Sequence, residues 1–207
     1  MRKQVTVFVF TFIIFVSASF AVYGAPGSEV NRNARAEHTP SRHVIDAIMD
    51  SYSGRSFKEG TVPDAAIEIL LNAAQKAPSA GNAQPWHFTV IRNAGIARQV
   101  APRHYAEGAL VIVISGRPDP RRPGIEIFDS ASASQNIYLA AQALGFGVRQ
   151  YITGVQEVNN NMRGSLGIPD GYNAIIIMMI GHSADETDAV SSASPRRPIE
   201  SNTNFIE

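Results

Sequence analysis

The stretch APSAGNAQPWHFTVI, residues 77–91, decides how the rest of this chain is interpreted. Pro78 cannot extend a preceding helix, and Gly81 and Asn82 tolerate positive φ, so the backbone is expected to turn sharply here. The following Trp-His-Phe-Thr-Val alternates apolar and polar side chains, a period of two that predicts a half-buried strand. Asn82 and Gln84 offer side-chain amides from a loop between a helix and a strand. Such a loop is typical of a binding site for a planar polar ligand.

The composition limits the chemistry that the protein's own side chains can perform. With 207 residues and 22.3 kDa, the chain is long enough for one domain with a substantial core. Its 18 basic and 18 acidic side chains cancel, so nothing indicates an electrostatic interaction with nucleic acid. The absence of cysteine excludes disulfides, thiol catalysis and cysteine-ligated metals. The five histidines show no metal-ligand spacing, so redox chemistry would need a bound cofactor.

The N-terminus has the pattern of a secretory signal peptide. Arg2 and Lys3 precede an apolar run over residues 5–22, and small residues follow at cleavage-site spacing. We therefore expect a signal peptide at 1–24, a flexible leader at 25–40 and one folded domain at 41–207. The alternative is an uncleaved anchor, the only case in which the protein would contact a membrane. Either way the folded part is exported, to the periplasm or the medium.

Helices and strands alternate irregularly along the rest of the chain. Apolar residues at helical spacing predict helices near 41–52, 96–105, 125–144 and 155–166, and another from Pro63 to the loop. Strands are predicted at 86–91, 109–115, 148–153 and 174–180. No dinucleotide-binding glycine fingerprint follows a predicted strand. The pattern predicts an α+β domain in which helices surround a mixed central sheet.

Residues 77–88 resemble the APS-x-x-N-x-QPW-x-F signature of FMN-dependent nitroreductases, and the resemblance extends over about 41–198. It implies a nitroreductase-like fold and bound FMN. It also implies an obligate homodimer with two FMN sites at the subunit interface, each built from both chains. Without that resemblance, the stretch would be an ordinary polar loop.

The first candidate cofactor site lies just past the first predicted helix. A hydroxyl and a guanidinium two residues apart, Ser53 and Arg55, can bind an anion or an electron-rich ring edge. The segment resembles the family's Arg-Arg-Ser-x-Arg, with Ser51 and Tyr52 in place of the first two arginines. By resemblance, Arg55 would lie near the flavin N1–C2=O edge. The serine at 51 removes one expected phosphate contact.

Two further candidates come from the opening loop. The resemblance implies that Asn82 hydrogen-bonds the flavin near N5 and that Gln84 contacts the ribityl chain. Alternatively, Asn82 only caps the loop backbone. Trp86 is expected to be a core residue rather than a ligand contact.

The last candidates lie in the C-terminal half. LGFGVRQYITG, residues 144–154, resembles a family stretch whose end passes over one face of the isoalloxazine, here Ile152, Thr153 and Gly154. The residues alone equally allow an ordinary helix–turn–strand. Arg196 and Arg197 resemble the family's basic residue before proline, which binds the FMN phosphate. Otherwise such a pair is a solvated or processing feature.

The implied activity is hydride transfer from NADH or NADPH through FMN to an electron-poor small molecule, such as a nitroaromatic or a quinone. Export raises a difficulty, because reduced nicotinamides are scarce outside the cytoplasm. A different donor is therefore also considered. Two alternatives remain from this stage. One is an exported flavin-binding protein of the same fold without NAD(P)H-driven turnover, and the other is a structural partner without a cofactor.

Overall fold

The core of the molecule is β3 (Leu110–Gly116), a strand in which every residue is buried. The computed structural model describes residues 44–184 and 196–206. Within them β3 lies between β2 (Trp86–Ile91) and β5 (Asn173–Ser183). The other edge of β5 pairs with β4 (Gly147–Tyr151) and, further along, with β1 (Phe57–Lys58).

All of these pairings are antiparallel, so the prediction of a mixed sheet is wrong for the described strands. The interleaving of helices and strands along the chain favours a mixed sheet. The strands β3 and β4 do run in the same direction, since both are antiparallel to β5. However, β5 lies between them and takes both sets of hydrogen bonds.

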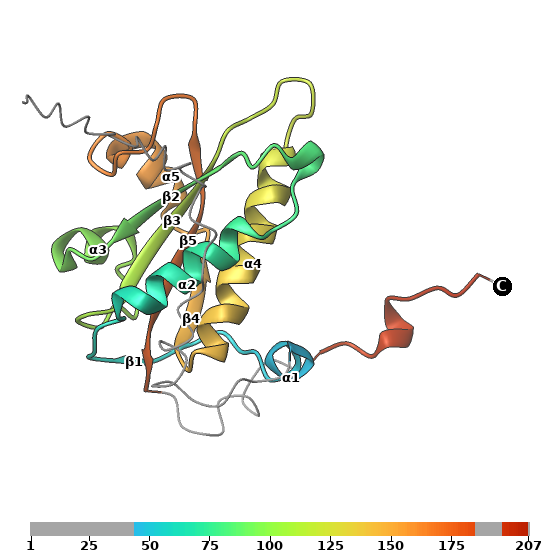
Figure 1. Cartoon of the computed structure of the whole chain (residues 1–207), viewed down its shortest axis with the longest axis horizontal. Coiled ribbons are helices and arrows are strands. Elements are labelled where there is room, and N and C mark those ends of the chain that lie inside the picture. The colour runs from blue at the N-terminus through green and yellow to red at the C-terminus, as the bar shows by residue number, and fades with distance from the viewer. Residues whose placement is uncertain (1–43, 185–195, 207) are drawn as a thin grey trace, which may run out of the picture.

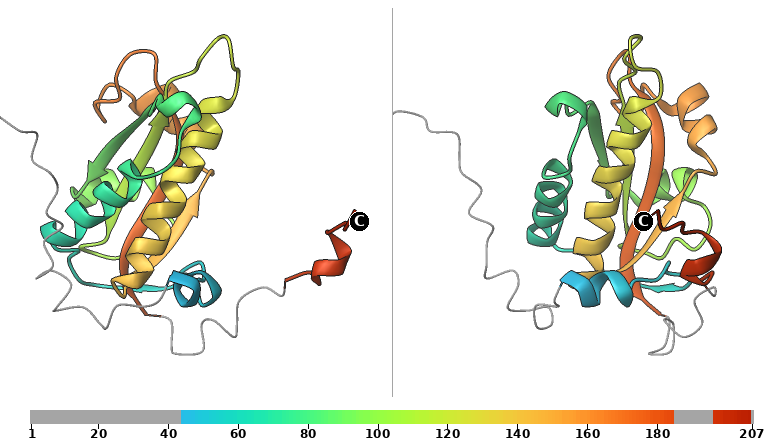
Figure 2. Two further views of the ribbon diagram at one scale, coloured as in Figure 1. Left: turned by 45° about the vertical axis from the view of Figure 1, so that its right-hand side comes forward. Right: turned by 90° about the vertical axis from the view of Figure 1, so that its right-hand side faces the viewer.

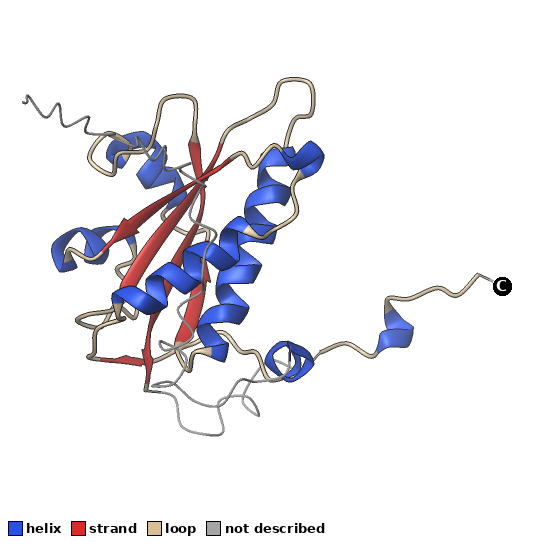
Figure 3. Ribbon diagram, viewed as in Figure 1, coloured by secondary structure: helices blue, strands red, loops and turns tan. Residues whose placement is uncertain are grey.

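Helices cover the sheet on both faces (Figures 1 and 2). On one face lie α2 (Asp64–Gln75) and the long α4 (Ile125–Ala143), and on the other lie α3 (Ala94–Val100), α5 (Val155–Glu157) and the π-helix η3 (Val158–Met162). The described tail carries the short helix η4 (Ile199–Ser201). The α+β class with helices around a central sheet is thus confirmed (Figure 3).

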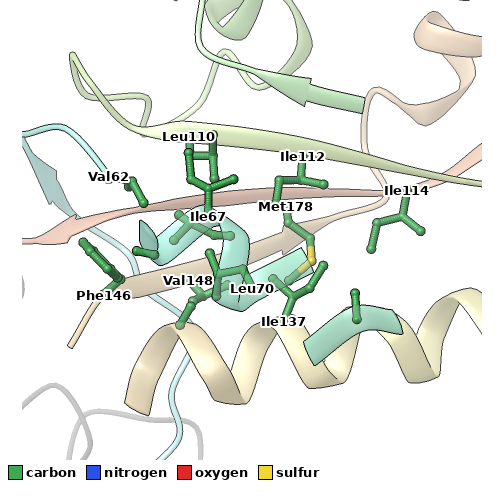
Figure 4. Packing of buried hydrophobic residues seen from close by; sticks show 14 of the residues in the cluster. Val62, Ile67, Leu70, Leu110, Ile112, Ile114, Ile137, Phe146, Val148 and Met178 are labelled. Carbon is green, nitrogen blue, oxygen red and sulfur yellow. The ribbon is translucent and has the colours of Figure 1, made fainter. Parts of the chain in front are cut away.

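Alternation along β3 divides the core in two. Leu110, Ile112 and Ile114 contact α2 and α4, whereas Val111 and Val113 face the α3 side. The first cluster is the larger one, and Figure 4 shows its side chains interdigitating between the sheet and the two helices. Burial on both faces explains why β3 reads as a continuous apolar run rather than as an alternating one.

Two predicted helices are shorter than expected. The helix predicted at 96–105 begins two residues earlier at Ala94, where Asn93 accepts a hydrogen bond from the Ile96 amide at 3.0 Å, and ends at Val100 before Pro102. The helix predicted at 155–166 is only α5 followed by the π-helix η3. The side chain of Asn159 there pairs with the backbone of Ala174 and so fixes this segment to the start of β5.

The first helix also differs from its prediction. The apolar residues of α1 (Val44–Met49), which were expected to form one apolar face of the helix, are exposed, and only Ala47 is buried. The predicted signal peptide 1–24, the anchor alternative 5–22 and the leader 25–40 lie outside the described residues. Among the described helices, none is long and apolar enough to cross a membrane.

Candidate functional site

The Asn82 loop, residues 77–85, is tied to the first turns of α4. The amide of Ala80 donates to both carboxylate oxygens of the buried Asp129, at 3.1 and 3.4 Å. Within the loop, the backbone amide of Gln84 donates to Ser79 Oγ at 3.0 Å. Gly81 has φ 65°, which glycine tolerates. The predicted sharp turn is therefore present, and side chains rather than a regular element hold it.

The two candidate amides of this loop contact each other. Gln84 Nε2 lies 3.3 Å from Asn82 Oδ1 and 3.5 Å from the Asn82 carbonyl oxygen. Both residues are exposed, and both have positive φ, 55° for Asn82 and 47° for Gln84. The loop therefore presents one coupled amide pair at the surface.

Trp86 is a core residue, as predicted. It is buried in the cluster between α2 and the sheet, and its indole Nε1 donates to Gln75 Oε1 at 3.1 Å. That hydrogen bond links the start of β2 to the end of α2 and fixes both ends of the Asn82 loop.

The Tyr52 segment, residues 51–55, lies at the other end of α4. The buried Gln142 side chain accepts from the Tyr52 amide at 3.4 Å and donates to the Tyr52 carbonyl at 2.6 Å. The Tyr52 hydroxyl donates to Ser183 Oγ at 3.1 Å, and the Gly54 amide donates to the Val148 carbonyl at 2.8 Å. The segment is thus fixed against α4, β4 and β5.

Within the Tyr52 segment the remaining predicted residues divide by exposure. The hydroxyl of Ser51 donates to the Ile48 carbonyl at 2.8 Å and so terminates α1. Ser53 and Arg55 are exposed on either side of the buried Gly54. The segment therefore exposes a hydroxyl residue and a guanidinium residue two positions apart.

Arg196 of the C-terminal tail acts on α4 through its charge. Burial raises the pKa of Tyr138 on α4; the adjacent Gln142 and, more weakly, Arg196 oppose that rise, whereas Tyr52 adds to it. Arg197 is exposed beside it.

The predicted residues Ile152, Thr153 and Gly154 form the turn after β4 and face two different hollows. Ile152 lines a hollow of about 510 Å³ together with Glu126 and Ile127 of α4. Thr153 and Gly154 line a smaller hollow of about 230 Å³ beside the end of α3. Gly154 has φ 96° and sits against the Val100 carbonyl, so this tight turn requires glycine.

The candidate residues do not converge within one chain. Asp129, which holds the Asn82 loop, and Gln142, which holds the Tyr52 segment, are 13 residues apart on α4. At 1.5 Å of rise per residue they are separated by roughly 20 Å along the helix. One three-ring isoalloxazine cannot contact both groups.

Asp129 and Gln142 were not identified from the sequence. Asp129 lies in the first turns of a helix, where an acidic residue is ordinary. Gln142 stands out more, because it interrupts the apolar stripe of an alanine-rich helix. A polar residue at a buried helical position is a usable signal, since it must find a partner. Among the described residues, no group of three or more His, Asp or Glu could hold a metal ion.

Similarity to known proteins identifies the class to which this fold and its two anchored segments belong. The model of the "Nitroreductase family" matches residues 48–107 and 102–182. This chain belongs to the nitroreductase family and is an oxidoreductase of that family.

Individual relatives support this family assignment. The chain is 31% identical over 164 residues to the "Putative NADH dehydrogenase/NAD(P)H nitroreductase" of Methanothermobacter thermautotrophicus, covering 74% of this chain and 84% of that protein. It resembles the NfrA1 nitroreductase from B. subtilis with a TM-score of 0.68 at 19% identity, over 78% of this chain and 73% of that one. It also resembles a nitroreductase with bound FMN from Desulfitobacterium hafniense, with a TM-score of 0.65 at 22% identity, over 81% and 100%. The nitroreductase-like fold is confirmed.

Proposed function

We propose that the protein is an FMN-dependent reductase that passes hydride from a nicotinamide to an electron-poor small molecule, such as a nitroaromatic or a quinone. The observation that carries this proposal is the Asn82 loop, whose exposed amides are held in place by Asp129 and Ser79. A rigid, hydrogen-bonding surface next to a strand is what a planar ring with polar edges requires. The bound FMN of the Desulfitobacterium relative and the nicotinamide names of other relatives support the cofactor and the donor.

The chain's residues fit FMN in their donor chemistry. The exposed guanidinium of Arg55 would stabilise negative charge at one ring edge, and Arg196 and Arg197 would neutralise the phosphate. Asn82 would hydrogen-bond the ring near N5. The turn at Ile152–Gly154 would lie against one ring face. When bound, FMN supplies the hydride-carrying chemistry that no side chain of this protein offers.

We further propose that the working unit is a homodimer. The roughly 20 Å between the two halves of the site along α4 requires two chains if each flavin is to meet both halves. The exposed large apolar side chains of the described residues all lie on α1, the start of α4, the turn after β4 and the tail. Such a set marks a protein interface. The members are Val44, Ile45, Ile48, Met49, Ile127, Phe128, Ile152, Ile199, Phe205 and Ile206.

We also propose that the protein is exported, and this proposal bears on the identity of its electron donor. The signal-peptide pattern supports export, and export in turn favours a donor other than cytoplasmic NADH or NADPH. Mass spectrometry of the protein recovered from the periplasm or medium tests the first proposal. An intact N-terminus together with a cytoplasmic location would contradict it.

The visible spectrum of the purified protein tests the function. We expect a flavin spectrum that bleaches when NADH or NADPH is added without oxygen and returns with a nitroaromatic or a quinone. A flavin spectrum that persists would favour binding without nicotinamide-driven turnover. A colourless protein that also takes up no added FMN would refute the proposal.

Arg55→Ala tests the assigned ring-edge cation. Losing one charge-assisted hydrogen bond of about 1.5–3 kcal/mol should weaken FMN binding by roughly 10- to 150-fold and leave the fold intact. Arg92→Ala is the matched control, because Arg92 is exposed and forms a surface ion pair with the exposed Asp64. Equal FMN affinity in both variants would remove Arg55 from the site.

A further inference from the structure

The contacts of Gln84 determine which way the Asn82 amide points. A backbone carbonyl can only accept a hydrogen bond, so the Gln84 atom facing the Asn82 carbonyl must be the donor Nε2. The same Nε2 faces the Asn82 side chain at 3.3 Å, so the Asn82 atom there must be the acceptor Oδ1. The Asn82 NH2 group, on the opposite side of Cγ within the same amide plane, therefore points away from Gln84 and can donate to a ligand.

The backbone of Gln84 is unfavourable for its side chain. Gln84 has φ 47°, in the left-handed region that costs most L-residues roughly 1–2 kcal/mol and that Asn and Gly occupy more easily. A glycine at this position would avoid that strain. Strain of this kind persists where the surroundings impose it, and it is commonly found at functional sites.

The contacts around Gln84 impose this strained backbone conformation. The Gln84 amide donates to Ser79 Oγ, and the neighbouring Ala80 amide donates to buried Asp129. The loop is thus anchored at two points, and the exposed Gln84 side chain hydrogen-bonds Asn82 at the surface.

We propose that Gln84 is a positioning residue that fixes Asn82 as a hydrogen-bond donor toward an acceptor atom of the bound ring. This inference rests on the proposed function. The resemblance implied that Gln84 contacts the ribityl chain directly. In this proposal Gln84 acts instead by holding the Asn82 side chain. A ring nitrogen that accepts when oxidised carries a proton when reduced, so a fixed donor at Asn82 favours the oxidised ring. Gln84 consequently lowers the reduction potential of the bound cofactor.

The test is a double-mutant cycle with Gln84→Met, a variant of similar length without hydrogen-bonding groups, in the wild-type and Asn82→Ala backgrounds. FMN affinity is measured by fluorescence titration and the potential by equilibration with reference dyes. We expect Q84M alone to weaken the binding of oxidised FMN about fivefold, the value of one net hydrogen bond, and to raise the potential. In the N82A background, Q84M should change neither quantity.

Gln135→Met, on the exposed surface of α4, is the matched control and should leave both measurements unchanged. Equal effects of Q84M in both backgrounds would show a direct contact and overturn the positioning role. No effect in either background would overturn it too. A wild-type protein that binds no FMN would overturn the proposed function as well, whereas binding with additive variants would overturn only the role of Gln84.

Discussion

At the scale of single residues, the Gln142 side chain hydrogen-bonds the backbone of Tyr52 in the way that a neighbouring strand would. Its side-chain amide accepts from the Tyr52 amide and donates to the Tyr52 carbonyl, which is the pattern of a backbone partner. Because Gln142 is buried, water cannot replace it easily. A single side chain thereby fixes the segment that carries Ser53 and Arg55.

Replacing Gln142 by Ala should destabilise the protein by about 1–3 kcal/mol, since it leaves two backbone groups without their partner. The urea midpoint of unfolding measures this, and FMN affinity should fall in parallel. Gln135→Ala is the control, because Gln135 is exposed on the same helix. If both variants unfold at the same urea concentration, the buried amide contributes nothing to stability.

Gly81→Ala should cost about 1–2 kcal/mol, because φ 65° places a Cβ in the left-handed region. A Cβ at Gly81 would otherwise have room, since the nearest atom is Arg122 Nη1 at 3.9 Å. The loss therefore comes from the backbone and not from a clash. Gly164→Ala, in open space without a positive φ, should not show this penalty in the same urea titration. An unchanged midpoint for G81A would mean that the loop adopts another conformation in solution.

At the scale of elements, α4 acts as the spacer of the site. Four of the five buried polar side chains of the described residues lie on it, Asp129 near its start and Gln142 near its end. The first holds the Asn82 loop and the second holds the Tyr52 segment. The length of this helix consequently sets the distance between the two halves of the candidate site.

The opposing helix α2 is held by apolar contacts instead. Leu70 is fully buried in the cluster that Figure 4 shows, whereas its neighbour Leu71 is only partly buried. Leu70→Ala should lower the free energy of unfolding by about 2–5 kcal/mol, since it leaves a cavity beneath α2. Leu71→Ala should cost clearly less. Thermal unfolding monitored by circular dichroism compares the two, and equal losses would contradict this packing.

At the scale of the whole molecule, the exposed apolar side chains predict a dimer. Phe128 is 74% exposed at the start of α4, close to the hollow that Ile127 and Ile152 line. Phe128→Asp should convert the protein to monomers and abolish FMN binding, because a charge would be buried at the interface. Sedimentation equilibrium measures the mass and absorbance measures the flavin. Asn160→Asp, on the π-helix over the other face, should leave both unchanged. A wild-type protein that is monomeric at micromolar concentration would contradict the prediction.

Much of the fold was predictable because local patterns specify it. Period-two alternation gave β2 with its observed bounds, and the apolar run gave β3 to within one residue. The pairing of the strands was not predictable. It depends on β5, the last of the described strands, which inserts between β3 and β4, a contact that no local pattern encodes.

The sequence by itself determined which residues are candidates for the site, because the Asn82 loop, Arg55 and the arginine pair resemble a family's signature at matching positions. Only the tertiary structure decided how they relate. It placed the Asn82 loop and the Tyr52 segment at opposite ends of α4, and it turned Gln84 onto Asn82. The physical reason is that the local sequence specifies which side chains are available and where the backbone turns. Distances between segments depend on hydrogen bonds such as those of Asp129 and Gln142, which form only when distant parts of the chain pack together.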